Sequence, residues 1–350
     1  MTHQNNRWRH RPEGSTWGDW GPDDTLGRMN LLTPQKVREG IEAVRTGKSF
    51  SLGLPLTLPG GTKLNANRLP PVHRPNLRSG QPNVNCGLNA SIAGATDILN
   101  DDLVILHPQY STQWDALVHA GARFDADGDG VDEICYYNGF TAADIEAPTS
   151  PEDCGATAEP GATTVDLGPL GIGSLAEHPV QGRAVMIDIE RHFGTDERLF
   201  TMNDLQYIID TDAVEVRSGD IVLFHTGFAE KVLSMGGDPD AQVLHHYGAC
   251  LDGTDAALLE WISDSGIAAI AADNYAVEKF MESGFSSPAP ALPLHHHCLF
   301  RLGVQLGELW HLTPLARHLA AAGQTDFLLT AQPLNLPGAS GSPLNPVATA

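Results

Sequence analysis

The chain has 350 residues, and 41% of them are hydrophobic, which is enough to bury a sizeable core. Its 21 Lys and Arg are outnumbered by 43 Asp and Glu, and the net charge of −22 argues against nucleic acid and anionic membrane surfaces as partners. No stretch approaches the roughly 20 apolar residues of a membrane span, and the polar N-terminal segment lacks the apolar region of a signal peptide. We therefore expect a soluble, cytoplasmic protein.

The first part of the chain predicts one helix, a long loop and a strand. Thr33 can cap a helix that starts at Pro34 and ends at Gly47. Pro, Asn, Arg and Gly are frequent from residue 62 to residue 89, which predicts an extended surface loop. The apolar run DLVIL (102–106) then predicts a short buried strand.

The second half of the chain alternates strand and helix patterns. Continuous apolar, β-rich runs at 183–190, 220–227 and 266–274 predict buried strands. Helical spacing lies between the first two runs at 196–210, and a further helix over 254–265 is predicted, capped by Thr254 and closed by Gly266. Strands that alternate with helices indicate the α/β class.

These patterns divide the chain into segments of one structural unit. We expect residues 1–100 to form an N-terminal arm, helix and extended loops, and residues 101–330 to form the main α/β domain. A polar segment at about 147–173 is typical of an inserted loop. The Pro- and Gly-rich tail, 331–350, predicts irregular structure on the surface.

Two separated motifs contain the residues best suited to chemistry. Asp115 and His119 are four residues apart and share one face if the segment is helical. Far downstream, His296 and Glu308 flank an apolar stretch that can bury them near one another. Histidine with Asp and Glu is the donor set of a divalent Zn or Mn site.

Together these motifs resemble the cyclase superfamily, which includes kynurenine formamidase and isatin hydrolase. Its signature is H-x-G-T-H-x-D-x-x-x-H, followed much later by a histidine and a glutamate twelve positions apart. Asp115 and His119 match the aspartate and final histidine of that signature, and His296 and Glu308 have the same separation of twelve. The resemblance implies an α/β fold, the family's swivelling β/β/α domain with a mixed central sheet and surrounding helices, and a homodimer or homotetramer.

The chain departs from the family pattern at two ligand positions. The first two histidines of the signature fall on Gln109 and Gln113. Three arrangements follow: one metal held by Asp115, His296 and Glu308 with help from glutamine or water; replacement of a lost ligand by His107; or no metal.

The resemblance also implies a reaction. The metal polarises a carbonyl and lowers the pKa of bound water toward about 7, while His119 acts as general acid and base. Hydrolysis of an amide, formamide or cyclic amide in a small aromatic or cyclic substrate is expected, and Trp114, His225 and Thr226 are candidate substrate contacts.

Other functions fit the same residues. A lactone or ester hydrolase, a cyclase or a dehydratase can use the same metal site, and loss of both histidines also fits a non-catalytic binding protein. Taken singly, Asp115 fits a surface acid, His119 a core histidine and Glu308 a helix cap.

The acidic segment after His119 matches the start of a calcium loop. Its candidate ligands are Asp125, Asp127, Asp129 and Asp132, but Tyr136 stands at position twelve, where a bidentate glutamate is expected. The segment therefore predicts either a structural Ca²⁺ site or a solvated acidic turn.

Overall fold

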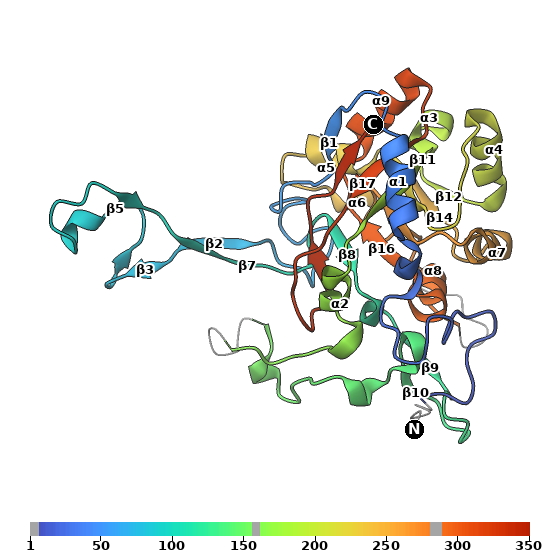
Figure 1. Ribbon diagram of the computed structural model, residues 1–350, viewed down its shortest axis with the longest axis horizontal. Helices are drawn as coiled ribbons and strands as arrows, with labels where there is room; N and C mark the ends of the chain where they lie inside the picture. Colours follow the sequence, from blue (N-terminus) through green and yellow to red (C-terminus); the bar gives the residue numbers. More distant parts are fainter. Residues whose placement is uncertain (1–6, 156–161, 281–288) are drawn as a thin grey trace.

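Nine strands form one mixed sheet, around which most of the chain is arranged (Figure 1). The structure is a computed structural model, and it describes residues 7–155, 162–280 and 289–350. In order across the sheet the strands are β1 (Ser49–Ser51), β19 (Val347–Thr349), β17 (Asp326–Thr330), β11 (Gln181–Asp188), β13 (Ile221–His225), β15 (Ala269–Ala272), β16 (Gln305–Glu308), β8 (Gln113–Asp115) and β18 (Gly341–Pro343). The expected α/β class with a mixed central sheet is confirmed.

The centre of the sheet consists of the four parallel strands β11, β13, β15 and β16. Their side chains are buried on both faces, as the continuous apolar runs predict. The three predicted strands of the second half are confirmed as β11, β13 and β15. The outer strands pair antiparallel on both sides of this centre.

Helices cover the sheet and are capped much as the sequence predicts. They are α1 (Pro34–Glu42), α2 (Ile172–Glu177), α3 (Ile189–Phe193), α4 (Met202–Asp212), α5 (Phe228–Ser234), α6 (Ala241–His245), α7 (Ala256–Ser265), α8 (Pro293–His295) and α9 (Thr313–Ala322). The Thr33 side chain accepts a hydrogen bond from the Lys36 backbone N–H and caps α1, whereas Asp255, and not Thr254, caps α7. None of the described helices is both long and apolar enough to cross a bilayer.

The region predicted as a loop and a buried strand is instead an exposed arm, defined here as residues 69–105 (Figure 1). Its long ribbon pairs β2 (Val72–Pro75) with β7 (Asp102–Ile105), and two smaller pairs follow toward the tip: β3 (Leu77–Arg78) with β4 (Gln81–Pro82), and β5 (Cys86–Gly87) with β6 (Ile98–Leu99). All four residues of β7 are exposed. The prediction of a buried strand at 102–106 is therefore wrong.

The C-terminal tail is also more regular than its composition predicts. It contributes β19, which pairs with β1 and β17, and β18, which pairs with β8 at the edge of the sheet. Pro and Gly are tolerated here because β18 is an edge strand and residues 344–346, between the two strands, belong to no helix or strand. Of the predicted insertion at 147–173, residues 156–161 lie outside the described residues.

A buried ion-pair network fixes the start of β13 to its neighbours. Asp220 is fully buried and accepts hydrogen bonds from Arg183 of β11 and, at 3.0 Å, from the Lys36 ammonium of α1. Arg183 also pairs with Asp326 of β17 at 3.1 Å. The Lys36 ammonium and the Arg183 guanidinium therefore share the Asp220 carboxylate in the interior, and Arg183 has a second carboxylate partner in Asp326.

Replacing Asp220→Asn should lower the free energy of unfolding by about 3 kcal/mol, because the two buried cations lose a shared counter-charge. Urea denaturation followed by circular dichroism measures the change. Asp210→Asn, on the exposed face of α4, is the matched control and should change it by less than about 0.5 kcal/mol. Equal effects of the two substitutions would contradict the structural role of Asp220.

Candidate active site

The pairing of β8 with β16 brings the two predicted motifs together. The strands run antiparallel, with Glu308 opposite Gln113. Because side chains alternate along a strand, Gln113 and Asp115 share one face of β8 and Trp114 points to the other. The carboxylates of Asp115 and Glu308 both lie in this buried region, with at most 3% of either residue exposed.

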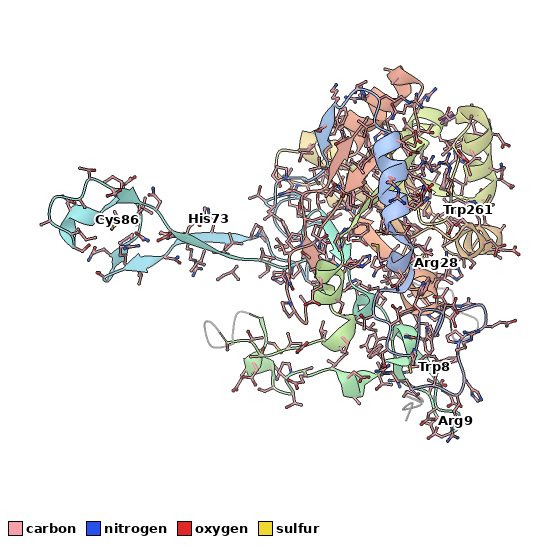
Figure 2. The ribbon with its side chains drawn as sticks, in the orientation of Figure 1. Trp8, Arg9, Arg28, His73, Cys86 and Trp261 are labelled. Atoms are coloured by element: carbon pink, nitrogen blue, oxygen red, sulfur yellow. The ribbon has the colours of Figure 1, made fainter. Side chains whose placement is uncertain are left out.

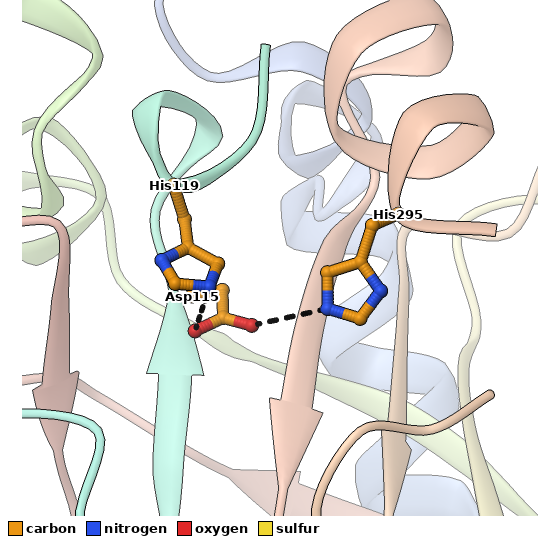
Figure 3. Close-up of side chains that lie close together, drawn as sticks. All are labelled: Asp115, His119 and His295. Atoms are coloured by element: carbon orange, nitrogen blue, oxygen red, sulfur yellow. Dashed lines mark ion pairs between the residues drawn. The ribbon is translucent and has the colours of Figure 1, made fainter. Parts of the chain in front are cut away.

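His119 reaches the same place from the short 3₁₀ turn at Leu117–His119 (Figure 3). Its Nε2 lies 3.9 Å from an oxygen of Asp115, and a quarter of its side chain is exposed. The predicted pairing of Asp115 with His119 is thus present, although the segment is a strand followed by a turn and not a continuous helix. His119 combines contact with a buried carboxylate and access to solvent.

A second imidazole enters the cluster from α8 (Figure 3). The Nε2 of His295 lies 3.9 Å from Asp115 and 3.5 Å from Glu308, while its Nδ1 lies 2.8 Å from Glu278. Glu278 also accepts the backbone N–H groups of Leu294 and His295, so one buried carboxylate fixes both the helix start and the ring orientation. Among the described residues, Asp115, His119 and His295 form a group able to hold a metal ion.

His296, the predicted ligand, lies outside this cluster. Its ring packs beside Phe300, with centroids 5.0 Å apart. The prediction assumed a strand, but the chain here is α8 followed by the π-helix His296–Leu302, in which consecutive side chains point in different directions. His295 therefore takes the place predicted for His296, while His297 contacts the Ser263 hydroxyl at 2.9 Å.

The cluster perturbs the protonation of its members. Burial and the charge of Asp115 raise the pKa of Glu308 to about 7. Burial favours the neutral form of His295, but the hydrogen bond to Glu278 and the charge of Glu308 outweigh it and raise the pKa of His295 to about 10. The charge of Asp115 raises the pKa of His119, yet burial and the positive charges nearby outweigh that effect, so its pKa falls below 6.5. His119 is therefore neutral at pH 7 and able to accept a proton.

The two glutamines at the family's histidine positions behave differently. The Gln113 amide donates to Glu308 at 2.8 Å and to Asp115 at 3.2 Å. Gln109 instead donates to the Ser340 hydroxyl at 2.7 Å, with the His119 ring 3.5 Å away. Among the described residues, neither the Gln113 Oε1 nor the Asp115 Oδ2 has a hydrogen-bond partner, although both are buried. Two unpaired buried oxygens beside a second carboxylate and an imidazole are suited to a divalent cation.

His107, the predicted substitute for a lost ligand, lies between β7 and β8. It belongs to neither of the metal-holding groups found among the described residues. Its carbonyl accepts the Tyr110 backbone N–H in the turn before β8.

Comparison with known proteins identifies the family. A family model described as "Putative cyclase" matches residues 64–279, more than half of the chain. The chain belongs to this cyclase family. A crystal structure described as a novel cyclase is 31% identical over 96% of this chain and 97% of its own, with a TM-score of 0.71.

Isatin hydrolases share the fold at lower identity. One bound to the product analogue thioisatinate is 12% identical over 90% of this chain and 98% of its own, with a TM-score of 0.52. Isatin hydrolase A from Labrenzia aggregata is 14% identical over 89% of this chain and 96% of its own, with a TM-score of 0.51. No match is found among curated proteins.

The three predicted substrate contacts of this cyclase-family chain lie in its core. Trp114 is fully buried, packs against Trp310 and donates its indole N–H to the Ala331 carbonyl. His225 is 2% exposed and lies 2.7 Å from Asp188, and Thr226 donates to the buried Asp273. All three side chains are therefore buried and paired within the protein, away from solvent.

A small pocket lies beside the cluster. Gln109 and Tyr110 line it together with Leu64, Arg68, Tyr275 and Leu309. The Arg68 guanidinium donates to the Gln109 carbonyl at 2.8 Å and lies 3.9 Å from Glu308. A larger hollow lined by Asp188 and Arg191 includes no residue of the cluster.

The sequence analysis did not identify Arg68, His295 and Glu278 as site residues, because no motif distinguishes them.

The acidic segment after His119 forms a compact turn. Its Asp125, Asp127 and Glu133 lie close enough to share a cation, whereas Asp129 and Asp132 are outside this group. The Asp125 carboxylate accepts the backbone N–H groups of Gly128 and Gly130. These hydrogen bonds also fit the alternative interpretation, a solvated acidic turn.

The surroundings of His225 predict a pH-dependent contribution to stability. Burial lowers its pKa, but the hydrogen bond to Asp188 and the charges of Asp273 and Glu190 outweigh burial and raise the pKa above 6.5. The protonated ring therefore stabilises the fold below about pH 6.5, and this contribution is lost as the pH rises through the folded-state pKa. His225→Gln should reduce the free energy of unfolding by about 2 kcal/mol at pH 6 and by less at higher pH.

Urea denaturation at a series of pH values measures this difference. His246→Gln, at an exposed histidine paired with Glu197, is the control and should show little effect at any pH. A deficit of His225→Gln that stays constant across the series would show that the buried ring is neutral.

Proposed function

We propose that the chain is a metal-dependent hydrolase that cleaves a carbon–nitrogen bond in an amide, formamide or cyclic amide. The observation that supports this function is the buried convergence of Asp115, His295 and Glu308 beside the partly exposed His119. Membership of the cyclase family, and a fold shared with isatin hydrolases, agree with it.

Asp115, His295 and Glu308 would hold the metal, with the Gln113 carbonyl oxygen as a neutral fourth donor. All three are buried, the His295 Nε2 lies 3.9 Å from Asp115 and 3.5 Å from Glu308, and the Gln113 amide donates to both carboxylates. The unpaired oxygens of Asp115 and Gln113 supply further lone pairs. One imidazole with oxygen donors suits Zn or Mn. Glu278 would orient the imidazole from behind, as carboxylates do for metal-bound histidines.

A divalent metal bound here would polarise the substrate carbonyl and lower the pKa of water toward about 7. The chain's own contribution is proton transfer by His119, whose Nε2 faces Asp115. The neutral ring takes a proton from the attacking water and returns it to the leaving nitrogen. Gln109 and Asp115 hold the ring from two sides, which fixes its orientation during both transfers.

The pocket beside the cluster supports a small aromatic or cyclic substrate. Tyr110 and Tyr275 offer aromatic surface, while Leu64 and Leu309 add apolar contacts. Arg68 is the charged group of this lining, and its guanidinium lies 3.9 Å from Glu308. A substrate with a planar ring and a carbonyl directed at His119 fits this combination.

Metal binding should depend on His295 and not on its neighbour. His295→Ala should lower the affinity for Zn or Mn by at least about tenfold. The loss is measured as a lower metal content in mass spectrometry of the purified protein. His296→Ala is the matched control, at the next residue along the chain, where the π-helix begins, and should retain the metal. Loss of metal only in His296→Ala, or no metal in any preparation loaded with Zn or Mn, would contradict the proposed site.

Turnover should depend on His119 without affecting metal content. His119→Ala should keep the metal and lower kcat by about 10²–10⁴-fold, because proton transfer is lost. Activity is measured on a panel of formamides, cyclic amides and lactones, with chelated and metal-restored protein alongside. Full activity of the variant would rule out the proton-transfer role of His119. Selective turnover of lactones would show that the enzyme cleaves an ester bond and not an amide bond. No turnover of the whole panel by metal-loaded protein would indicate a binding protein.

A further inference from the structure

Arg68 stands where the arm joins the body, in the lining of the pocket beside the cluster. In Figure 2 the labelled His73 marks the arm beyond it. The other side chains that line the pocket are neutral. The side chain of Arg68 is 23% exposed, so the guanidinium is neither fully solvated nor sealed in the core. The pocket thus has one positive charge in its lining, in a chain whose net charge is −22.

The guanidinium of Arg68 has more donors than partners. A guanidinium has five N–H donors in a planar fork. Among the described residues, a single hydrogen bond is found for Arg68, from Nη1 to the Gln109 carbonyl at 2.8 Å. The ion pair with Glu308 spans 3.9 Å, which is longer than the about 2.7–2.9 Å of a charge-assisted hydrogen bond. Most of the fork therefore remains able to bind a ligand.

Two more deeply buried arginines show how this chain satisfies a guanidinium elsewhere. Arg28, labelled in Figure 2, is 5% exposed and donates to two backbone carbonyls through two different nitrogens. Arg183 is 2% exposed and ion-pairs with two carboxylates. Arg68 has neither arrangement. A partly buried charge without a close partner is unfavourable, so this guanidinium is suited to a ligand that supplies the missing counter-charge.

A carboxylate is the counter-charge that fits this guanidinium best. Its two oxygens match the fork and accept two parallel N–H bonds. A neutral carbonyl accepts hydrogen bonds but leaves the positive charge uncompensated. The acidic groups elsewhere on the chain are largely screened beyond about 8 Å at physiological ionic strength, so they do not prevent an anion from reaching Arg68.

The rest of the pocket lining favours an aromatic ring beside that carboxylate. The Tyr110 hydroxyl donates to the Gly61 carbonyl and accepts the Gly60 backbone N–H, so its one donor is used within the protein. Leu64 and Leu309 add apolar side chains. Apolar contacts with one charged anchor are the combination that orients a small ligand in a pocket.

We propose that Arg68 binds a carboxylate of the substrate and so makes the site specific for amides or formamides of aromatic acids. The bond that is cleaved rests on the proposed function, whereas the binding of the anion does not. A cation held by Asp115 and Glu308 would neutralise these two carboxylates. Arg68 would then lack a counter-charge until the substrate supplies one.

Paired substrates separate the effect of charge from that of shape. The three formamidobenzoate isomers have a carboxylate, and the corresponding formamidobenzamides have a neutral group of nearly the same size in its place. For metal-loaded wild type we expect kcat/KM of at least one isomer to be about 10- to 100-fold higher as the benzoate, the range of a charged hydrogen bond. Arg68→Met should abolish this preference by raising KM for the benzoate, with little change for the benzamide.

Two further variants provide the controls. Arg68→Lys keeps the charge but not the fork, and should retain part of the preference. Arg74→Met removes the same charge from the exposed strand β2 and should behave as the wild type. Metal content and circular dichroism should be the same in all variants, which separates loss of anion binding from loss of the site or of the fold.

Calorimetric titration with benzoate and benzamide measures the preference without turnover. Metal-loaded wild type and Arg74→Met should bind benzoate at least about tenfold more tightly than Arg68→Met does. Wild type that binds benzoate no better than benzamide would overturn the role of Arg68. Full benzoate affinity in Arg68→Met, as expected if the anion binds the metal alone, would also overturn it, and so would an equal loss of both substrates. Benzoate binding through Arg68 without hydrolysis of any substrate would overturn the proposed function and support the anion site.

Discussion

The antiparallel pairing of β8 with β16 is the contact on which the site depends. It places Gln113 beside Glu308, although 195 residues of chain separate them. The C-terminal tail braces the pair from outside, because β18 pairs with β8 and sets Gly341 opposite Asp115. An added Cβ at Gly341 would lie 2.7 Å from the Trp114 carbonyl oxygen, so only glycine permits this approach. Ser340, the neighbouring residue, holds the Gln109 amide.

Two buried carboxylates form the centre of the cluster, basic groups lie next to them, and a further carboxylate lies behind one of these basic groups. Asp115 and Glu308 are buried side by side, which is unfavourable unless positive charge lies near both. His295 supplies it from one side, and Glu278 behind it stabilises the imidazolium. Arg68 supplies it from the pocket side. A bound cation would take the place of the proton on the His295 Nε2 and neutralise the two carboxylates directly.

The sequence predicts strands well where residue type alone indicates burial. It predicts the direction of a side chain poorly where that direction depends on whether the segment is a strand or a helix. The central strands are apolar on both faces, so β11, β13 and β15 follow from residue type alone. The choice between His295 and His296 depends on whether the segment is a strand or a helix, and a run of three histidines gives no sign of either. Composition likewise predicts an irregular tail. It cannot show that residues 341–343 lie beside β8 and pair with that strand. For the arm, the pattern of β7 does indicate burial, but a single chain does not provide the covering surface.

The arm and the pocket meet at one place in the chain. The arm leaves the body after Arg68 and returns just before Gln109, and a hydrogen bond between these two residues closes its base. Both residues line the pocket, and Gln109 also touches His119. The arm is therefore joined at its base to the groups that surround His119 and Glu308, both through the chain itself and through one hydrogen bond.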